Sequence, residues 1–394
     1  GEWMEGVNDS HGTHVTGTVG ANRDGSGFHG VAWESDIIVG NTGATDDNNY
    51  GPFQDYTYFK NAWGTLADAV AKANGDRGVI NNSWGTNTRV VDQGDKGLDG
   101  YNTGVHLNVN TQAESDYEFM LFSKRYPTGD TTPAKEAGIS DNTSFVYAAY
   151  EAVKDKNIVQ IMTTGNRDMA NPYYRALYPY YNPAAEKHWI AVAGLKQGAT
   201  EGTYELIKNF NEAGIGKWWT VAAPGNGIYS STTDDHGNPG YASWGGTSMA
   251  APHVAGAMGV LMSRYDQMNA LQVRDVMFTT ANHYNADGSV MEGWKDRDGT
   301  ERKDGEVSDR MGWGVPDLQK GMFGPGQFLG TFTYNMAKTG SLDVWSNDIT
   351  NVALDQRLAE DEEWMTETEN GTKLPYDKIV DGSGFIVLDG DKNA

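Results

Sequence analysis

Short apolar runs alternate with longer amphipathic segments over most of this 394-residue chain, and this alternation constrains its fold more than any other feature. Apolar runs of a length typical for buried strands occur at 35–40, 78–84, 157–165, 188–195 and 218–225. Segments with helical periodicity and alanine-rich faces occur between them, at 64–75 and 144–156. Strands that alternate with helices predict an α/β fold, a parallel sheet with helices on both faces.

Two segments depart from this alternation. Residues 95–142 are rich in Gly, Asn, Thr and Asp, which predicts a long insertion folded on the surface. After residue 325, short alternating runs such as "FLGTFTYNM" and "GSGFIVLDG" predict the start of a β-rich segment. We therefore expect one large domain over residues 1–325 and the beginning of a second segment over 326–394.

Composition excludes several classes of function. The formal net charge of −23 repels phosphate backbones and argues against nucleic-acid binding. There are no cysteines, so disulfides, thiolate nucleophiles and Cys-ligated metals are excluded. No apolar run approaches the roughly 20 residues that a membrane-spanning helix needs.

The segment "GGTSMAAPHVAGAMGVLMSRY" at 245–265 carries the strongest chemical signal. Ser248 stands just before a helical run whose small residues allow close packing and leave room for a substrate backbone. The free N–H groups and positive dipole at a helix N-terminus stabilise an oxyanion, which suits a nucleophilic serine. Alternatively, Ser248 is only a helix N-cap.

A second signal is "HGTHVTGTVGA", which starts at His11 and continues as a small-residue helix. His11 suits a general base, but the alternatives are a core histidine or a metal site shared with His14. A zinc-protease helix spaces its histidines four residues apart, with a Glu after the first. Gly12 occupies that Glu position, so the pattern favours catalysis over metal binding and a structural role for His14.

A third signal is "TTGNRD" at 163–168, in which Asn166 follows a strongly apolar strand. Open α/β sheets place active sites at the carboxyl ends of their strands. The Asn166 side-chain amide could donate to an oxyanion there, although an asparagine in a turn is the alternative interpretation.

Taken together, these strings resemble the subtilisin-like serine proteases, the subtilase family. "SHGTHVTGTVGA" resembles the family's histidine motif, "GTSMAAPHVAGA" its serine motif and "MTTGN" the segment of its oxyanion asparagine. The resemblance implies that Ser248 is the nucleophile and His11 the general base. It also implies that Asn166 and the Ser248 backbone N–H form the oxyanion hole.

The same resemblance implies how a substrate would bind. Polypeptide substrates would lie extended and pair with Ser83, Trp84 and Gly85 as an added strand. Leu177 would lie at the base of the main specificity pocket and favour small or medium side chains before the scissile bond. No cofactor is required. Many subtilases bind structural Ca²⁺, but the acidic stretch "DRDGTERKDGEVSD" at 296–309 lacks clean ligand spacing and is better interpreted as a polar loop.

The chain departs from the family pattern at the catalytic acid. Family members run in the order Asp, His, Ser, with the aspartate on an earlier strand. Asp9 is too close to His11 in sequence to fold back under its imidazole, and Glu2 and Glu5 lack a strand-like context. We expect the acid to precede residue 1; the alternative is a downstream Asp that reaches His11 through a rearrangement. We expect the chain as it stands to be nearly inactive without the upstream acid.

The tail resembles the junction of autotransporter-type subtilases, in which the protease runs into a β-helical stalk. This resemblance implies a secreted protein or one at a Gram-negative cell surface, with an outer-membrane barrel in the full-length chain. The overall hypothesis is a serine endopeptidase. The alternative hypothesis is a non-catalytic, adhesin-like module on a protease fold.

Overall fold

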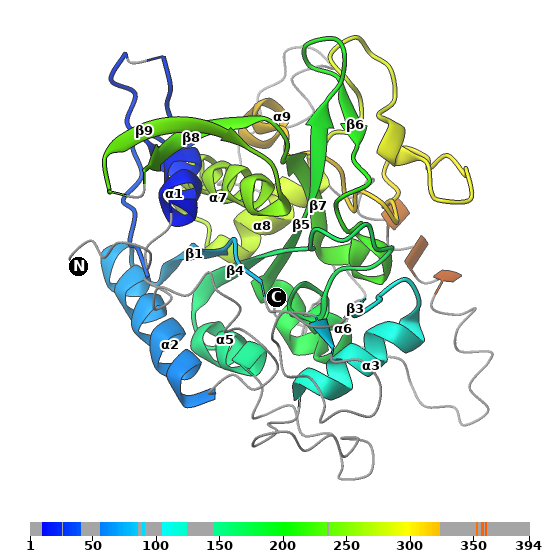
Figure 1. Ribbon diagram of the computed structural model, residues 1–394, viewed down its shortest axis with the longest axis horizontal. Helices are drawn as coiled ribbons and strands as arrows, with labels where there is room; N and C mark the ends of the chain where they lie inside the picture. The colour runs from blue at the N-terminus through cyan, green and yellow to red at the C-terminus, as the bar shows by residue number, and fades with distance from the viewer. Residues whose placement is uncertain are drawn as a thin grey trace.

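A parallel sheet forms the centre of the computed structural model (Figure 1), which describes residues 10–25, 27–40, 56–85, 89–90, 105–123, 145–234, 236–323, 352–353, 356–357 and 359–360. Its strands run in the order β1, β4, β5 and β7, each parallel to the next. Their bounds are β1 Arg77–Asn82, β4 Asn157–Thr163, β5 Trp189–Gln197 and β7 Thr220–Pro224. These strands confirm four of the five predicted apolar runs.

Helices cover both faces of this sheet, as predicted. Figure 1 shows α7 (Thr247–Arg264) and α8 (Ala270–Thr279) on one side and α2 (Tyr56–Ala73) and α5 (Phe145–Val153) on the other. α7 crosses all four parallel strands, and its alanines bury completely against them, as Ala250 and Ala251 show. The close approach that small residues permit therefore fixes the position of the helix that begins beside Ser248.

A β-hairpin holds α1 (His11–Gly20) against α7. The hairpin strands are β8 (Ile228–Thr233) and β9 (Pro239–Trp244), which pair antiparallel. The remaining elements are β2 Arg89–Val90, β3 Val105–His106, β6 Tyr204–Leu206, α3 Gln112–Ser123, α6 Tyr174–Tyr181, α9 Leu318–Phe323 and the 3₁₀ turns η2 Pro183–His188, η3 Gly214–Trp219 and η4 Glu292–Trp294.

The predicted strand at 35–40 is wrong. Residues 36–40 adopt no regular structure, and the side chains of Ile37, Ile38 and Val39 are 38%, 41% and 70% exposed. An apolar run becomes a strand only when a neighbouring strand supplies hydrogen-bond partners, and none of the described residues pairs with this run. The strand was predicted from hydrophobicity alone, which does not show whether a neighbouring strand is present.

The insertion predicted at 95–142 is described only in part, and that part does not lie wholly on the surface. β3 pairs with β2, and α3 packs on α6. Glu118 and Phe119 of α3 are buried, and the Phe119 ring stacks on Tyr181 with a centroid distance of 3.9 Å. α3 therefore brings an acidic side chain into the interior next to α6.

The tail after residue 325 is also described only in part. Its described pieces at 352–353, 356–357 and 359–360 are helical, so the β-rich expectation does not hold for them, and the rest of 326–394 lies outside the described residues. The Arg357 guanidinium donates to both Glu186 carboxylate oxygens at 2.9 and 3.0 Å, and Ala353 is buried in the main core. This part of the tail therefore packs against the domain that contains the central sheet.

None of the helices among the described residues is both long enough and apolar enough to cross a membrane.

Candidate active site

Ser248 is the second residue of α7 and begins its first turn. The residue before the helix, Gly246, is fixed because its N–H donates to the Gly225 carbonyl at 2.7 Å. The Ser248 hydroxyl donates to the Ser83 carbonyl oxygen at 2.8 Å, and Ser83 follows directly after β1. The structure thus joins the start of α7 to the carboxyl end of a central strand, where the fold class predicts a site.

Asn166 lies at the end of the next strand, β4, and its amide orientation is set by Thr247. Asn166 Oδ1 accepts two hydrogen bonds, from the Thr247 N–H and from the Thr247 hydroxyl, each 2.8 Å long. Because the oxygen of the amide is engaged in this way, the Nδ2 donor points to the other side.

The two proposed oxyanion donors converge on one point next to Gly246. A Cβ atom placed on Gly246 would lie 3.6 Å from Asn166 Nδ2 and 3.6 Å from the Ser248 backbone N. The first N–H groups of a helix have no partner inside the helix, so the Ser248 N–H can donate outward. An oxygen atom that carries developing negative charge could accept hydrogen bonds from both groups there.

The loop that carries Asn166 is held by a residue that the sequence analysis did not identify. Asn211 accepts the Arg167 N–H through its Oδ1 at 2.9 Å, and its own N–H donates to the Gly165 carbonyl at 2.9 Å. Gly165 has φ +123°, and a Cβ there would lie 2.6 Å from the Tyr173 ring, so this turn requires glycine. Asn211 lies in no motif, and its sequence gave no signal of this role.

Substitution of Asn166 should reduce turnover, since its donor is needed mainly as the oxyanion develops. We expect Asn166→Ala to lower kcat about 10²–10³-fold with little change in KM. Asn166→Asp is the matched variant, because it keeps the oxygen that accepts from Thr247 but removes the donor. Steady-state kinetics should show a large loss in both variants. Normal turnover in Asn166→Asp would mean that Asn166 only positions Thr247.

His11 is the first residue of α1, and α1 packs against α7, the helix of Ser248 (Figure 1). His14, one turn later, is fully buried; its Nε2–H points at the carbonyls of Ile228 and Ala242, at 3.0 and 3.1 Å, and its ring stacks on Trp244. Burial lowers the pKa of His14 below its usual value, as it does for His253 on α7. His14 is therefore a structural residue that fixes α1 and so the start of the helix at His11.

The segment Ser83–Gly85 extends past the end of β1. Ser83 is buried, and its hydroxyl accepts a hydrogen bond from Asn81 Nδ2 at 2.8 Å. The Trp84 ring stacks on Phe59 and Trp63, each at a centroid distance of 5.7 Å. Gly85 is exposed. The segment is thus anchored at two residues and reaches the surface at the third.

Leu177, which the resemblance implied at the base of the main specificity pocket, lies in the interior. Its side chain has no exposed surface and packs in the main core, where its Cδ1 lies 3.3 Å from a Cβ placed on Gly216. Arg175, two residues earlier on α6, lies next to Gly85: its Nη2 is 2.8 Å from a Cβ placed on that glycine.

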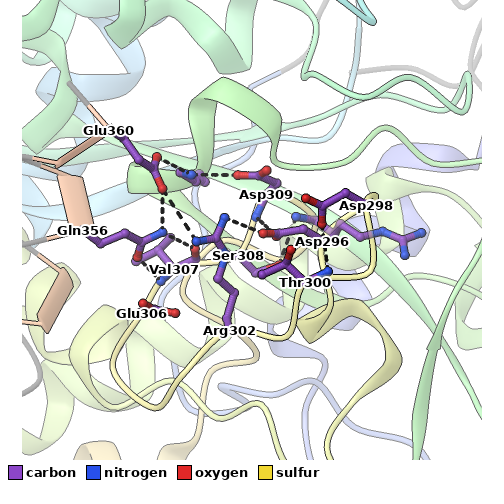
Figure 2. Close-up of polar contacts among 12 residues, drawn as sticks. Asp296, Asp298, Thr300, Arg302, Glu306, Val307, Ser308, Asp309, Gln356 and Glu360 are labelled. Atoms are coloured by element: carbon purple, nitrogen blue, oxygen red, sulfur yellow. Dashed lines mark hydrogen bonds and ion pairs between the residues drawn. The ribbon is translucent and has the colours of Figure 1, made fainter. Parts of the chain in front are cut away.

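The acidic stretch at 296–309 forms ion pairs and caps turns. Figure 2 shows Asp296 beside Arg302, with which it forms an ion pair. Asp309 pairs with Lys217 at 2.7 Å. Lys217 also pairs with Glu360 of the tail at 2.6 Å. Within the described ranges, no group of three or more His, Asp or Glu side chains has an arrangement that could hold a metal ion. The basic partners of Asp296 and Asp309, Arg302 and Lys217, both also pair with Glu360 and so join the tail to the domain.

The subtilase family profile matches residues 4–314 of the chain. An extracellular serine protease of Serratia marcescens is 30% identical over 345 residues, which cover 81% of this chain and 28% of that protein. The autotransporter lipoprotein NalP of Neisseria meningitidis is 27% identical over 350 residues, 86% of this chain and 27% of NalP. The chain thus spans less than a third of the length of these relatives.

Among solved structures, sphericase aligns with a TM-score of 0.47 and 20% identity, over 79% of this chain and 78% of sphericase. Fervidolysin of Fervidobacterium pennivorans aligns with the same TM-score and 21% identity, over 81% of this chain and 36% of fervidolysin. The match of the family profile over most of the chain and the motifs at its site agree. The chain belongs to the subtilase family of serine proteases, and it is similar to autotransporter-type members of that family.

Proposed function

We propose that this chain is the catalytic domain of a serine endopeptidase in which Ser248 attacks the peptide carbonyl. The observation that carries this proposal is the convergence of Asn166 Nδ2 and the Ser248 N–H, each 3.6 Å from one point beside Gly246. A domain that only bound other proteins would gain nothing from an amide oriented by two hydrogen bonds to Thr247. Such preorganised donors stabilise charge that develops during acyl transfer.

In the proposed reaction, Ser248 Oγ forms a bond to the carbonyl carbon while its proton passes to the His11 imidazole. The carbonyl oxygen becomes an oxyanion between the two donors. His11 then gives the proton to the leaving amine, which leaves an acyl-enzyme, and water repeats the sequence to release the acid. The hydroxyl must first leave the Ser83 carbonyl, to which it donates here. An aspartate that orients His11, as the sequence analysis expects, would complete the Ser/His/Asp mechanism.

Substrates would bind extended along Ser83–Gly85. This segment continues the edge strand β1, whose only paired neighbour among the described strands is β4. An edge of this kind offers backbone N–H and C=O groups to an added strand. The similarity to an extracellular protease and an autotransporter lipoprotein supports a secreted or cell-surface location.

Digestion of an unfolded protein by the natural full-length protein tests this function. Mass spectrometry should find new termini within the substrate, and a serine-directed inhibitor should abolish them. An intact substrate under all conditions would favour the alternative, an adhesin-like module without catalysis.

A further inference from the structure

The Arg175 guanidinium lies next to Gly85, at the surface end of the proposed substrate-binding segment. A Cβ on Gly85 would lie 2.8 Å from Arg175 Nη2 and 3.1 Å from both Cζ and Nη1. Any side chain at position 85 would therefore displace the guanidinium. Arg175 Nη2 also donates to the Thr163 hydroxyl at 3.0 Å.

These contacts place a cation between the two chain segments that flank Ser248. Thr163 ends β4, three residues before Asn166, and Ser83, two residues before Gly85, accepts the Ser248 hydroxyl. An extended chain advances about 3.3 Å per residue, so Gly85 lies about 7 Å along the chain from that contact. A side chain of a substrate residue next to the attacked carbonyl can span such a distance.

The guanidinium lacks an anionic partner within the described residues. Arg175 is only 5% exposed, and its Nε is buried without a hydrogen-bond partner. Nη1 also makes no hydrogen bond within the described residues. Unlike Nε, it is not fully buried. A buried charge without a partner has a high desolvation free energy. A carboxylate that bound next to Arg175 would offset part of that free energy.

Glu118 of α3 is a carboxyl group close enough to influence this charge, but it does not pair with it. Its Oε1 accepts the Tyr174 N–H, and its Oε2 is buried without a partner. Burial raises the pKa of Glu118 to about 8 and lowers the pKa of Arg175 to about 10. Burial thus disfavours the ionised form of the Glu118 carboxyl, which weakens it as a partner for the guanidinium.

We propose that Arg175 is a specificity-determining residue that binds the carboxylate of an aspartate or glutamate next to the scissile bond of the substrate. The inference rests on the proposed peptidase function and names its substrate class. Arginine suits this role because its planar fork matches the geometry of a carboxylate. This proposed preference for acidic residues differs from the preference for small or medium side chains that was expected from Leu177.

The test compares two fluorogenic peptides that differ only by Glu or Gln before the scissile bond, using the natural full-length protein. Because a site built for a charged group rejects an analogue without it, we expect kcat/KM to be about 100-fold higher for the Glu peptide. A ratio near one, or faster cleavage after Phe or Leu in a peptide library, would overturn the inference.

Arg175→Met should bring the Glu-to-Gln ratio close to one. Arg264→Met is the matched control, because Arg264 is an exposed arginine at the far end of α7 and its removal changes the net charge by the same amount; it should keep the ratio. If Arg175→Met does not fold, the ratio for the unaltered protein decides by itself. Cleavage without acidic preference rejects only this inference, whereas the absence of any cleavage rejects the proposed function with it.

The buried Glu118 also makes stability depend on pH. Its folded-state pKa of about 8 lies above the ordinary 4.5, so the folded state binds the extra proton and stability falls as pH rises through this window. We expect Glu118→Gln to gain stability relative to the unaltered protein between pH 5 and pH 9 in urea unfolding. The exposed Glu201→Gln should not do so, and parallel curves for Glu118→Gln and the unaltered protein would contradict the account.

Discussion

Ser248→Ala should abolish peptide hydrolysis while the protein remains folded. The substitution removes the only proposed nucleophile, and in subtilisin loss of the serine lowers kcat about 10⁶-fold. The hydroxyl makes one hydrogen bond, to the Ser83 carbonyl, at a half-buried position, so its removal should cost little stability. Peptidase rate and thermal melting, measured on the same preparation of the natural full-length protein, test both halves of this expectation.

The matched control is Ser263→Ala, which makes the same change at the exposed, far end of α7. It should retain both activity and melting temperature. Turnover in Ser248→Ala comparable to that of the control would remove Ser248 from the mechanism.

His11→Ala should reduce kcat about as much as Ser248→Ala, about 10⁶-fold, because a serine hydroxyl is a weak nucleophile until a base takes its proton. Residues that act as a unit are not additive, so the double variant should be hardly slower than either single one. His236→Ala, at an exposed turn between β8 and β9, should leave the rate intact.

Kinetics of the three variants separate this account from a structural role for His11. If His11→Ala and Ser248→Ala losses multiplied in the double variant, the two residues would act independently. A His11→Ala variant that melts much earlier would instead point to a role in anchoring α1, which the structure assigns to His14.

The sequence predicted the central sheet well because its strands are buried on both faces. A strand buried on both faces has apolar residues that point to both sides, as the run "NIVQIMTTG" does. β4 covers most of this run, and six of its seven residues are buried. The failure at 35–40 has the same origin. The run is as apolar as the others, but strand formation depends on a neighbour that composition does not reveal.

The site was predictable only where a motif carries it. Ser248 and Asn166 lie in such strings, and the structure brings Thr247, next to Ser248, onto the Asn166 amide. Arg175 lies in a tyrosine-rich stretch without a motif. Leu177 lies two residues further along α6, and two residues of a helix differ by about 200° in direction, so the two buried side chains point to different neighbours.

Position 85 shows a further limit of sequence reasoning. A glycine there was readily interpreted as part of an extended segment that binds substrate. The contact between Gly85 and the Arg175 guanidinium joins two residues that are ninety positions apart in the chain. Contacts of that range follow from the folded topology and leave no local pattern.

Labelling with a fluorophosphonate probe tests the central claim most directly, since the probe reacts with a serine only when a base and an oxyanion hole activate it. The natural full-length protein should be labelled at Ser248, as peptide mapping would show, with Ser248→Ala unlabelled and Asn166→Ala labelled much more slowly. A protein that folds, as thermal melting would report, but takes up no probe at Ser248 would contradict the assignment of this site as a serine peptidase.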